Sequence, residues 1–231
     1  MRTALWTGLA LAVMCGDRTA CGQSAGEKSG GWRTIFDGKS LDGWKHVGPG
    51  KMVLQDGVMR TEGGMGLLWY TKEKFGDCVI RVVYRTRDKR ANSGVYVRIA
   101  DRPKDPWYAV HHGYEVQICD ADDEFHGTGA IYSLSKSTAR PVHPPGEWNT
   151  MEIMLRGEEI LVMINGGEVN DFDPKTAQVP ERTKDHEPER GPRPTSGYIG
   201  LQNHGDVTND AVVEFKEVSV RPLGPKDTKK R

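Results

Sequence analysis

The fold of this chain is decided by two stretches, Asn92-Ser93-Gly94-Val95-Tyr96-Val97-Arg98 and Gly113-Tyr114-Glu115-Val116-Gln117-Ile118-Cys119-Asp120. In both, side chains alternate with the two-residue period of a β-strand, whose successive side chains point to opposite faces. The first stretch would place Tyr96 and Arg98 on the face opposite its valines. The second would place Glu115 and Gln117 on the face opposite its apolar residues. The alternation therefore predicts two strands that bury one face in a core and present the other as a candidate functional surface.

The rest of the chain carries strand signals in short pieces. Met52–Arg60 predicts a hairpin that turns at an Asp-Gly step, and Ile160 begins a second hairpin that turns at Asn165-Gly166. Gly129–Tyr132 predicts a short strand, whereas 103–112 and the proline-rich 172–196 predict loops. No segment has a helical stripe longer than two turns. Many short strands at regular spacing predict an all-β sandwich.

Charge and length narrow the class of protein. The chain has 231 residues with 32 basic and 32 acidic side chains, so its formal net charge is zero. This balance removes the electrostatic case for nucleic acid or an anionic membrane as the main partner. The length suits one large β domain that needs no metal or disulfide to fold. We accordingly expect Cys78 and Cys119 to be buried free thiols.

The N-terminus has the composition of a secretory signal peptide. Arg2 supplies a positive charge, Thr3–Gly16 is uncharged, and the small residues Thr19–Gly22 precede a polar run. The apolar run is too short to span a bilayer, and neither cysteine of this region fits a lipoprotein signal well. We predict a secreted or periplasmic protein with no transmembrane segment. The expected organisation is a signal peptide over 1–22, a disordered leader over 23–31, one domain over 32–222 and a disordered tail over 223–231.

Six motifs occur in an order that resembles one family. They are Phe36-Asp37-Gly38-Lys39-Ser40-Leu41-Asp42-Gly43-Trp44, 92–98, 113–118, Thr128-Gly129-Ala130-Ile131-Tyr132, Gly146-Glu147-Trp148-Asn149 and Leu201-Gln202-Asn203-His204-Gly205. Together they resemble the 3-keto-disaccharide hydrolase domain family, formerly a domain of unknown function, from about Trp32 to Pro222. The resemblance implies a concanavalin A-like jelly roll of two curved antiparallel sheets that acts on oxidised sugars. One departure is Lys216 in the last strand, where the family commonly shows an Arg-Asn pair.

Ordinary glycosidase chemistry fits the polar face poorly. A retaining glycosidase needs two carboxylates about 5–5.5 Å apart. Gln117 cannot ionise, and Asp120 has the wrong parity for the face of Glu115 unless a bulge intervenes. The residues therefore disfavour double-displacement hydrolysis.

A 3-keto sugar needs only one base and one electrophile. Its ketone acidifies the proton on C2, so the C1 substituent leaves by elimination and water then adds to the enone. We assign Glu115 as the base, Arg98 as the group that holds the enolate, and His204 as an alternative base or the acid for the leaving group. Residues assigned to substrate binding are Tyr96, Gln117, Asp120, Tyr132, Trp148 and Gln202.

Other interpretations of the same residues remain open. Arg98 and Glu115 would also suit a cross-strand ion pair, and a sugar-binding module without activity would share the fold and an aromatic-lined face. A structural cell-surface domain would need no such cluster. Trp107, Tyr108 and Trp148 would suit stacking on a sugar as well as packing in the core.

No cofactor is identified by the sequence. The acidic loop that holds Asp120, Asp122, Asp123 and Glu124 would suit Ca²⁺, but it lacks the spacing of a known calcium loop. His111 and His112 would need a third ligand to hold a transition metal. We therefore assign no metal ligand, and the expected partner is a glycoside or oligosaccharide substrate.

Overall fold

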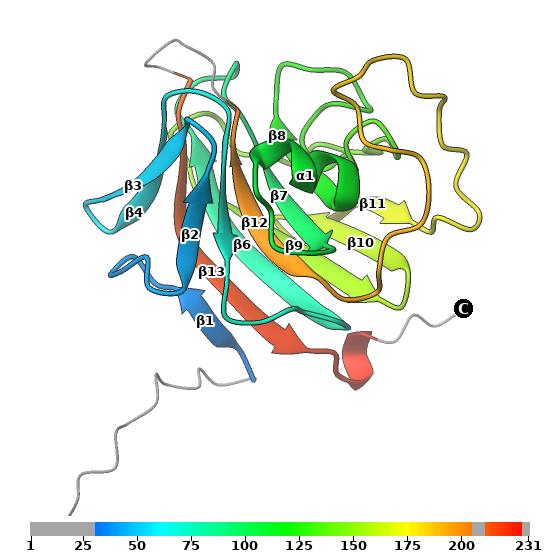
Figure 1. The fold of residues 1–231 in the computed structure, drawn as a ribbon, viewed down its shortest axis with the longest axis horizontal. Coiled ribbons are helices and arrows are strands. Elements are labelled where there is room, and N and C mark those ends of the chain that lie inside the picture. The colour runs from blue at the N-terminus through cyan, green and yellow to red at the C-terminus, as the bar shows by residue number, and fades with distance from the viewer. Residues whose placement is uncertain (1–30, 205–210, 228–231) are drawn as a thin grey trace, which may run out of the picture.

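The structure is a computed structural model that describes residues 31–204 and 211–227. The predicted signal peptide, most of the leader and the last four residues lie outside the described residues. Two antiparallel β-sheets pack face to face (Figure 1), which confirms the predicted all-β sandwich. Neither described helix is long and apolar enough to cross a membrane.

The larger sheet has eight strands in the order β11-β10-β9-β6-β13-β4-β3, and β1 also pairs with β13. Its strands are β1 (Arg33–Phe36), β3 (Lys51–Gln55), β4 (Val58–Glu62), β6 (Cys78–Thr86), β9 (Asn149–Arg156), β10 (Glu159–Ile164), β11 (Gly167–Phe172) and β13 (Val213–Pro222). Both predicted hairpins are present. Asp56-Gly57 and Asn165-Gly166 turn with positive φ at both residues, as the tightest hairpin turns require.

The smaller sheet has five strands in the order β2-β5-β12-β7-β8. Its strands are β2 (Trp44–Val47), β5 (Gly66–Tyr70), β7 (Asn92–Ile99), β8 (Tyr114–Cys119) and β12 (Tyr198–Asn203). The two stretches that decide the fold are thus the neighbouring strands β7 and β8, paired antiparallel with Tyr96 directly opposite Glu115.

The core lies between the two sheets. Val95 and Val116 from the smaller sheet pack in one cluster with Ile80 and Ile153 from the larger sheet, and all four are fully buried. Complete burial of such a side chain typically contributes about 1.5–3 kcal/mol, so the apolar faces of these strands hold the sheets together. Cys78 and Cys119 are buried free thiols, as expected.

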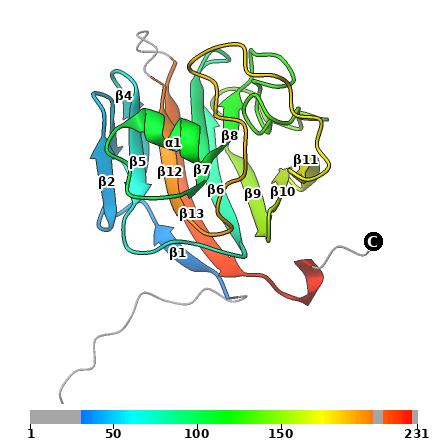
Figure 2. The ribbon, with the colours of Figure 1, turned by 45° about the vertical axis from the view of Figure 1, so that its right-hand side comes forward.

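One predicted loop contains a helix. Within 103–112, Pro106–His112 forms α1, which lies across β12 and β7 on the outer face of the smaller sheet (Figure 2). Asp105 caps the helix by accepting a 3.0 Å hydrogen bond from the Tyr108 backbone N–H, and Pro106 occupies the first turn. The helix was missed because two turns are too short for a clear apolar stripe.

The predicted strand Gly129–Tyr132 is also wrong. Gly129 has a φ of +87°, and Ile131 makes only isolated bridges, to Val116 and Ser135. The segment nevertheless runs beside the edge strand β8, because the Tyr132 N–H donates to the Glu115 carbonyl at 2.9 Å. It therefore covers an edge that would otherwise be free to pair with another chain.

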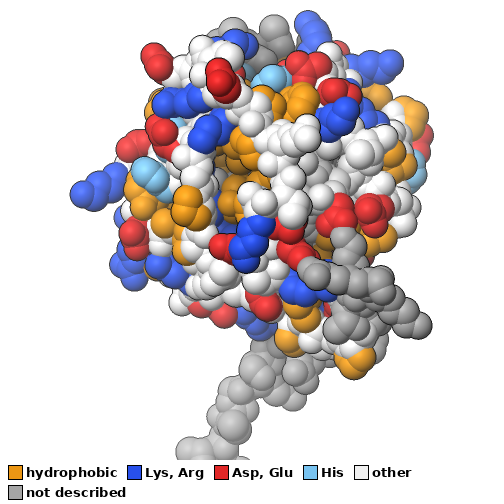
Figure 3. All heavy atoms as spheres, turned by 90° about the vertical axis from the view of Figure 1, so that its right-hand side faces the viewer, with side chains coloured by type: hydrophobic (Ala, Val, Ile, Leu, Met, Phe, Trp, Pro, Cys, Tyr) orange, Lys and Arg blue, Asp and Glu red, His pale blue; other side chains and the backbone are white. Residues whose placement is uncertain are grey.

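The structure confirms the predicted loop after β11, whereas the predicted disordered tail contains a short helical turn. Residues 173–197 form no helix or strand, as expected, and the loop runs beside α1 to reach β12 (Figure 2). In the tail, Pro225–Asp227 forms a 3₁₀ turn, and Asp227 accepts hydrogen bonds of 2.5 and 2.8 Å from Arg221. Acidic and basic side chains are interspersed on the face shown in Figure 3, in keeping with the balanced charge of the chain.

Candidate active site

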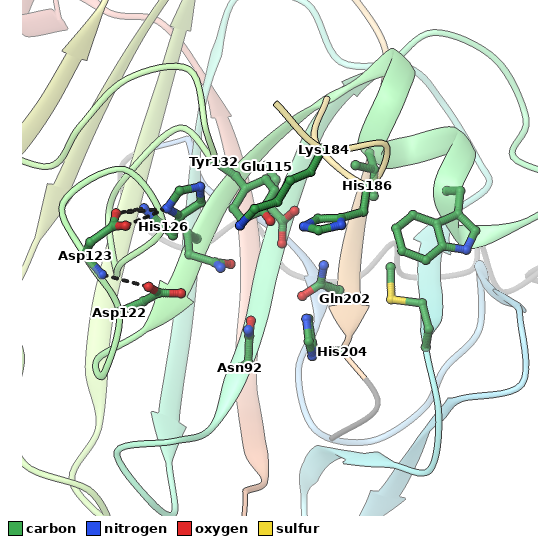
Figure 4. Close-up of a pocket in the computed structure, with 14 residues that line it drawn as sticks. Asn92, Glu115, Asp122, Asp123, His126, Tyr132, Lys184, His186, Gln202 and His204 are labelled. Carbon is green, nitrogen blue, oxygen red and sulfur yellow. Dashed lines mark hydrogen bonds and ion pairs between the residues drawn. The ribbon is translucent and has the colours of Figure 1, made fainter. Parts of the chain in front are cut away.

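A cavity of about 560 Å³ opens on the outer face of the smaller sheet (Figure 4). Its floor is the outer polar face of β12, β7 and β8, and its walls come from α1, the loop after β8 and the loop 173–197. The lining residues are Met65, Asn92, Trp107, Val110, Glu115, Gln117, Asp122, Asp123, His126, Tyr132, Lys184, His186, Gln202 and His204.

Three neighbouring strands supply a buried polar network under this cavity. The Tyr96 hydroxyl of β7 donates a 2.9 Å hydrogen bond to Oε2 of Glu115 on β8. The side-chain amide of Gln202 on β12 donates to the same hydroxyl at 2.9 Å. Across the described residues, Oε1 of Glu115 and Oε1 of Gln202 have no hydrogen-bond partner. Both oxygens are buried, and both belong to residues that line the cavity.

The sequence makes room for this carboxylate at Gly94. A Cβ at that position would lie 2.7 Å from Cγ and 2.9 Å from Cδ of Glu115, closer than real Cβ atoms approach. Only glycine therefore allows Glu115 to lie across β7. The side chain is 6% exposed, and this burial raises the pKa of Glu115 to about 8, although the Tyr96 hydrogen bond opposes the rise.

A carboxyl group with this pKa can serve as a general base or acid near neutral pH. An unpartnered oxygen of a buried carboxylate costs about 1–3 kcal/mol, so a ligand that donates a hydrogen bond to it would recover that cost. The arrangement is thus suited to removing or delivering a proton within the cavity.

Arg98, predicted to hold the enolate, lies elsewhere. It is 1% exposed, and its guanidinium donates to the carbonyl of Glu158 at 2.8 Å and to that of Gly157, in the turn between β9 and β10. No ion pair joins it to Glu115 among the described residues. The alternative of a cross-strand ion pair is therefore wrong as well.

A break in strand alternation explains this position. Arg98 has a φ of +54°, and the pairing of β7 with β12 shifts register between Tyr198 and Gly200. Such an irregularity adds a residue to one strand and reverses the face of the residues beyond it. Ile99 consequently shares the outer face with Tyr96, and Arg98 turns toward the larger sheet. Gly197 permits the close approach, because a Cβ there would lie 2.5 Å from the Arg98 Cα.

Two residues assigned to substrate binding do not line the cavity. Asp120 accepts a 2.5 Å hydrogen bond from the Thr128 hydroxyl, so it braces the loop after β8. Trp148 lies at the larger sheet, where its ring faces the guanidinium of Arg85 at 4.4 Å and the ammonium of Lys216 at 5.5 Å. These contacts give both residues structural roles.

The other assigned residues are brought together. Glu115, Gln117, Tyr132, Gln202 and His204 line the cavity, and Tyr96 lies beneath it within the polar network. Sequence reasoning missed Lys184 and His186, because a loop without periodicity gives no sign of which side chains point inward. Trp107 lines the cavity and is 45% exposed, which favours a stacking surface over packing in the core.

One group of side chains could contact a metal ion. Potential ligand atoms of Asp122, Asp123 and His126 all lie within 4.8 Å of one another, and this is the single such group in the described part of the chain. The His126 ring nitrogen Nδ1 already lies 2.9 Å from both carboxylate oxygens of Asp123. One imidazole nitrogen beside two carboxylates is not the all-oxygen donor set that Ca²⁺ prefers, so we assign no Ca²⁺ site here.

Comparison with known proteins gives consistent matches. The family described as 3-keto-alpha-glucoside-1,2-lyase-like domain matches residues 31–221. A Bacteroides thetaiotaomicron protein named 3-keto-disaccharide hydrolase is 24% identical over 234 residues, covering 84% of this chain and 79% of that protein. A crystal structure of a candidate glycosyl hydrolase from Parabacteroides distasonis has 27% identity and a TM-score of 0.68, covering 83% of this chain and 99% of that one.

More distant likenesses concern the fold alone. Carbohydrate-binding module CBM66 of Bacillus subtilis has 15% identity and a TM-score of 0.51, covering 78% of this chain and 95% of that one. Other matching structures likewise have concanavalin A-like or galectin-like folds, which confirms the predicted fold class.

Proposed function

The chain belongs to the 3-keto-alpha-glucoside-1,2-lyase-like domain family, and we propose that it cleaves the glycosidic bond of 3-keto-glycosides by elimination followed by hydration. The observation that carries this proposal is the buried Glu115 carboxyl group. One of its oxygens is held by Tyr96, and the other has no partner in the described structure and belongs to the cavity lining. Distant homology to a 3-keto-disaccharide hydrolase supports the same substrate class.

The reaction suits a single base. The carboxylate of Glu115 removes the proton from C2, and the electron pair moves onto the oxygen at C3 to give an enolate. The enolate re-forms the ketone as the bond between C1 and the leaving oxygen breaks, and that oxygen takes a proton. Water then adds hydroxide to C1 while Glu115 returns its proton to C2. The sum is hydrolysis.

Double displacement has less support from this site. Besides Glu115, the carboxylates that line the cavity are those of Asp122 and Asp123. Figure 4 shows both on the loop at one side of the cavity, away from Glu115, and Asp123 is engaged by His126. Neither is placed beside Glu115 as the second carboxylate of a retaining pair would be.

The test compares a 3-keto-glucoside with the same glucoside that has not been oxidised. We expect aglycone release from the keto sugar alone, and we expect Glu115→Gln to lower the rate about 10²–10⁴-fold. Glu168→Gln, an exposed position on β11, is the matched control and should keep the wild-type rate. Binding of the keto sugar without cleavage would identify a sugar-binding module instead. Full activity in Glu115→Gln would show that Glu115 is not the base, and His204 would be the next candidate.

A further inference from the structure

We propose that the loop 173–197 completes the active site, with Lys184 stabilising the enolate and His186 protonating the leaving oxygen. This assignment rests on the proposed function. It fills the role predicted for Arg98, whose guanidinium is held at the turn between β9 and β10. Lys184 and His186 are the two residues of this loop that line the cavity.

The loop is fixed in place where these two residues lie. Glu187, 4% exposed, accepts hydrogen bonds from the Thr183 hydroxyl at 2.9 Å and from the Arg190 guanidinium at 3.1 Å. Lys184 and His186 are thus enclosed between the two ends of a short closed turn. The backbone that carries both residues is therefore fixed, and their side chains are exposed at the cavity.

Two further contacts tie the loop to the walls of the cavity. Arg190 donates to the hydroxyl of Ser133 at 3.2 Å, next to the cavity residue Tyr132. Arg193 donates to the Gly113 carbonyl at 3.0 Å, at the start of β8. The loop is therefore attached to segments that flank Glu115, so its position is coupled to that of the base.

The charge of Lys184 is available to a ligand. Within the described chain, the nearby loop cations Arg182 and Arg190 are paired with Glu189 and Glu187, whereas Lys184 makes no ion pair. Figure 4 shows its ammonium group reaching across the cavity in the direction of Tyr132 and His126. An unpaired cation directed into a cavity is suited to a substrate oxygen that becomes negative during the reaction.

The order of the residues across the cavity matches the order of the reacting atoms. In a 3-keto-glycoside C2 lies between C3, which carries the enolate oxygen, and C1, which carries the leaving oxygen. In Figure 4 the ammonium end of Lys184 lies on the Tyr132 side of Glu115, and His186 lies on the side of α1. The α1 side also carries the apolar Trp107 and Val110, a suitable surface for an aglycone.

The proton balance agrees with these positions. Lys184 stays protonated and holds the oxygen at C3 by charge and a hydrogen bond. His186 gives a ring N–H proton to the oxygen that leaves C1. When water adds, His186 takes a proton from it while the protonated carboxyl group of Glu115 returns its proton to C2. Both side chains regain their initial state, and no oxidant is required.

Two measurements on one substrate series separate the roles. Exchange of the C2 proton in D₂O reports enolate formation, and aglycone release reports loss of the leaving group. The substrates are 3-keto-glucosides of methanol and of 4-nitrophenol, because 4-nitrophenolate leaves without being protonated. The variants are Lys184→Met and His186→Gln, with Lys175→Met, an exposed partner of Glu158 in the same loop, as control.

We expect Lys184→Met to lower both exchange and release about 10²-fold or more. We expect His186→Gln to keep C2 exchange, to lose methanol release about 10²-fold, and to release 4-nitrophenol at nearly the wild-type rate. Wild-type exchange in Lys184→Met, or a defect in His186→Gln that is equal for both leaving groups, would overturn the assignment. A wild-type protein that neither exchanges nor releases would overturn the proposed function and this assignment with it.

Discussion

Tyr96 and Glu115 lie directly opposite each other on β7 and β8, and their side chains meet through a 2.9 Å hydrogen bond to Oε2 of the carboxylate. The bond lowers the pKa of Glu115, whereas burial raises it, and burial prevails with a pKa of about 8. The proposed base is therefore largely protonated at neutral pH. Activity should rise with pH to a midpoint near this value.

Removing the hydroxyl with Tyr96→Phe should move that midpoint to higher pH, because the ionised carboxylate loses a donor that stabilises it. The measurement is the pH profile of kcat/KM for aglycone release from a 3-keto-glucoside. Tyr84→Phe is the matched control, since Tyr84 is also fully buried and its hydroxyl has no hydrogen-bond partner in the described structure. An unchanged midpoint in Tyr96→Phe would mean that the rise of activity with pH reports the ionisation of a group other than Glu115.

The same carboxyl group should affect stability with a defined sign. Its pKa rises from 4.5 in the unfolded chain to about 8 in the fold, so the folded state binds the extra proton between these values. Stability relative to Glu115→Gln should be highest below pH 4.5 and fall, by up to about 1.4 kcal/mol per pH unit, until pH 8. Urea unfolding of both proteins from about pH 4 to about pH 9 measures this difference. If the stability of the wild type relative to Glu115→Gln increased with pH, that result would contradict burial of the Glu115 carboxyl group.

Gly94→Ala should displace the base. The new Cβ would overlap the Glu115 side chain. We expect the carboxyl group, rather than the backbone of β7, to move away from this overlap. We expect a loss of kcat of about 10²-fold or more in a folded protein, comparable to removal of the base. Gly76→Ala is the control, because its Cβ would meet only ordinary contacts at 3.9 Å. Near wild-type kcat in Gly94→Ala would show that the base is not placed by this contact.

Arg98→Met should reduce stability far more than catalysis. The guanidinium holds the turn at 157–159 through backbone carbonyls that would lose their donors. A loss of about 2–4 kcal/mol in unfolding free energy is expected from a buried network of this kind. The rate per folded molecule should change little. A stable variant with a large fall in kcat would indicate that Arg98 takes part in catalysis.

The two candidate stacking tryptophans should behave differently. Trp107 lines the cavity, whereas Trp148 lies against Arg85 at the larger sheet. Trp107→Ala should raise KM for aryl 3-keto-glucosides about tenfold or more, because a stacking contact of this kind is worth about 1–3 kcal/mol. Trp148→Ala should leave KM unchanged. Equal effects of both changes on KM would argue against an aglycone subsite at α1.

Local patterns in the sequence determined the sandwich and part of its site. Alternation in β7 and β8 correctly placed Tyr96, Glu115 and Gln117 on the face opposite the core, because strand side chains alternate wherever pairing is regular. The Asp-Gly and Asn-Gly steps predicted two hairpins, since few other residues accept positive φ at both central positions. Each of these properties depends on neighbours along the chain.

Tertiary structure alone decided where Arg98 points and what covers the base. The shift in register between β7 and β12 reverses the face at Arg98, and it depends on close approach to Gly197, a residue far along the chain. Lys184 and His186 reach the cavity because a buried Glu187 closes their loop. The pKa of Glu115 likewise comes from burial among several segments. Alternation records only the local direction of a side chain, whereas burial, charge and proximity are set by elements that meet after folding.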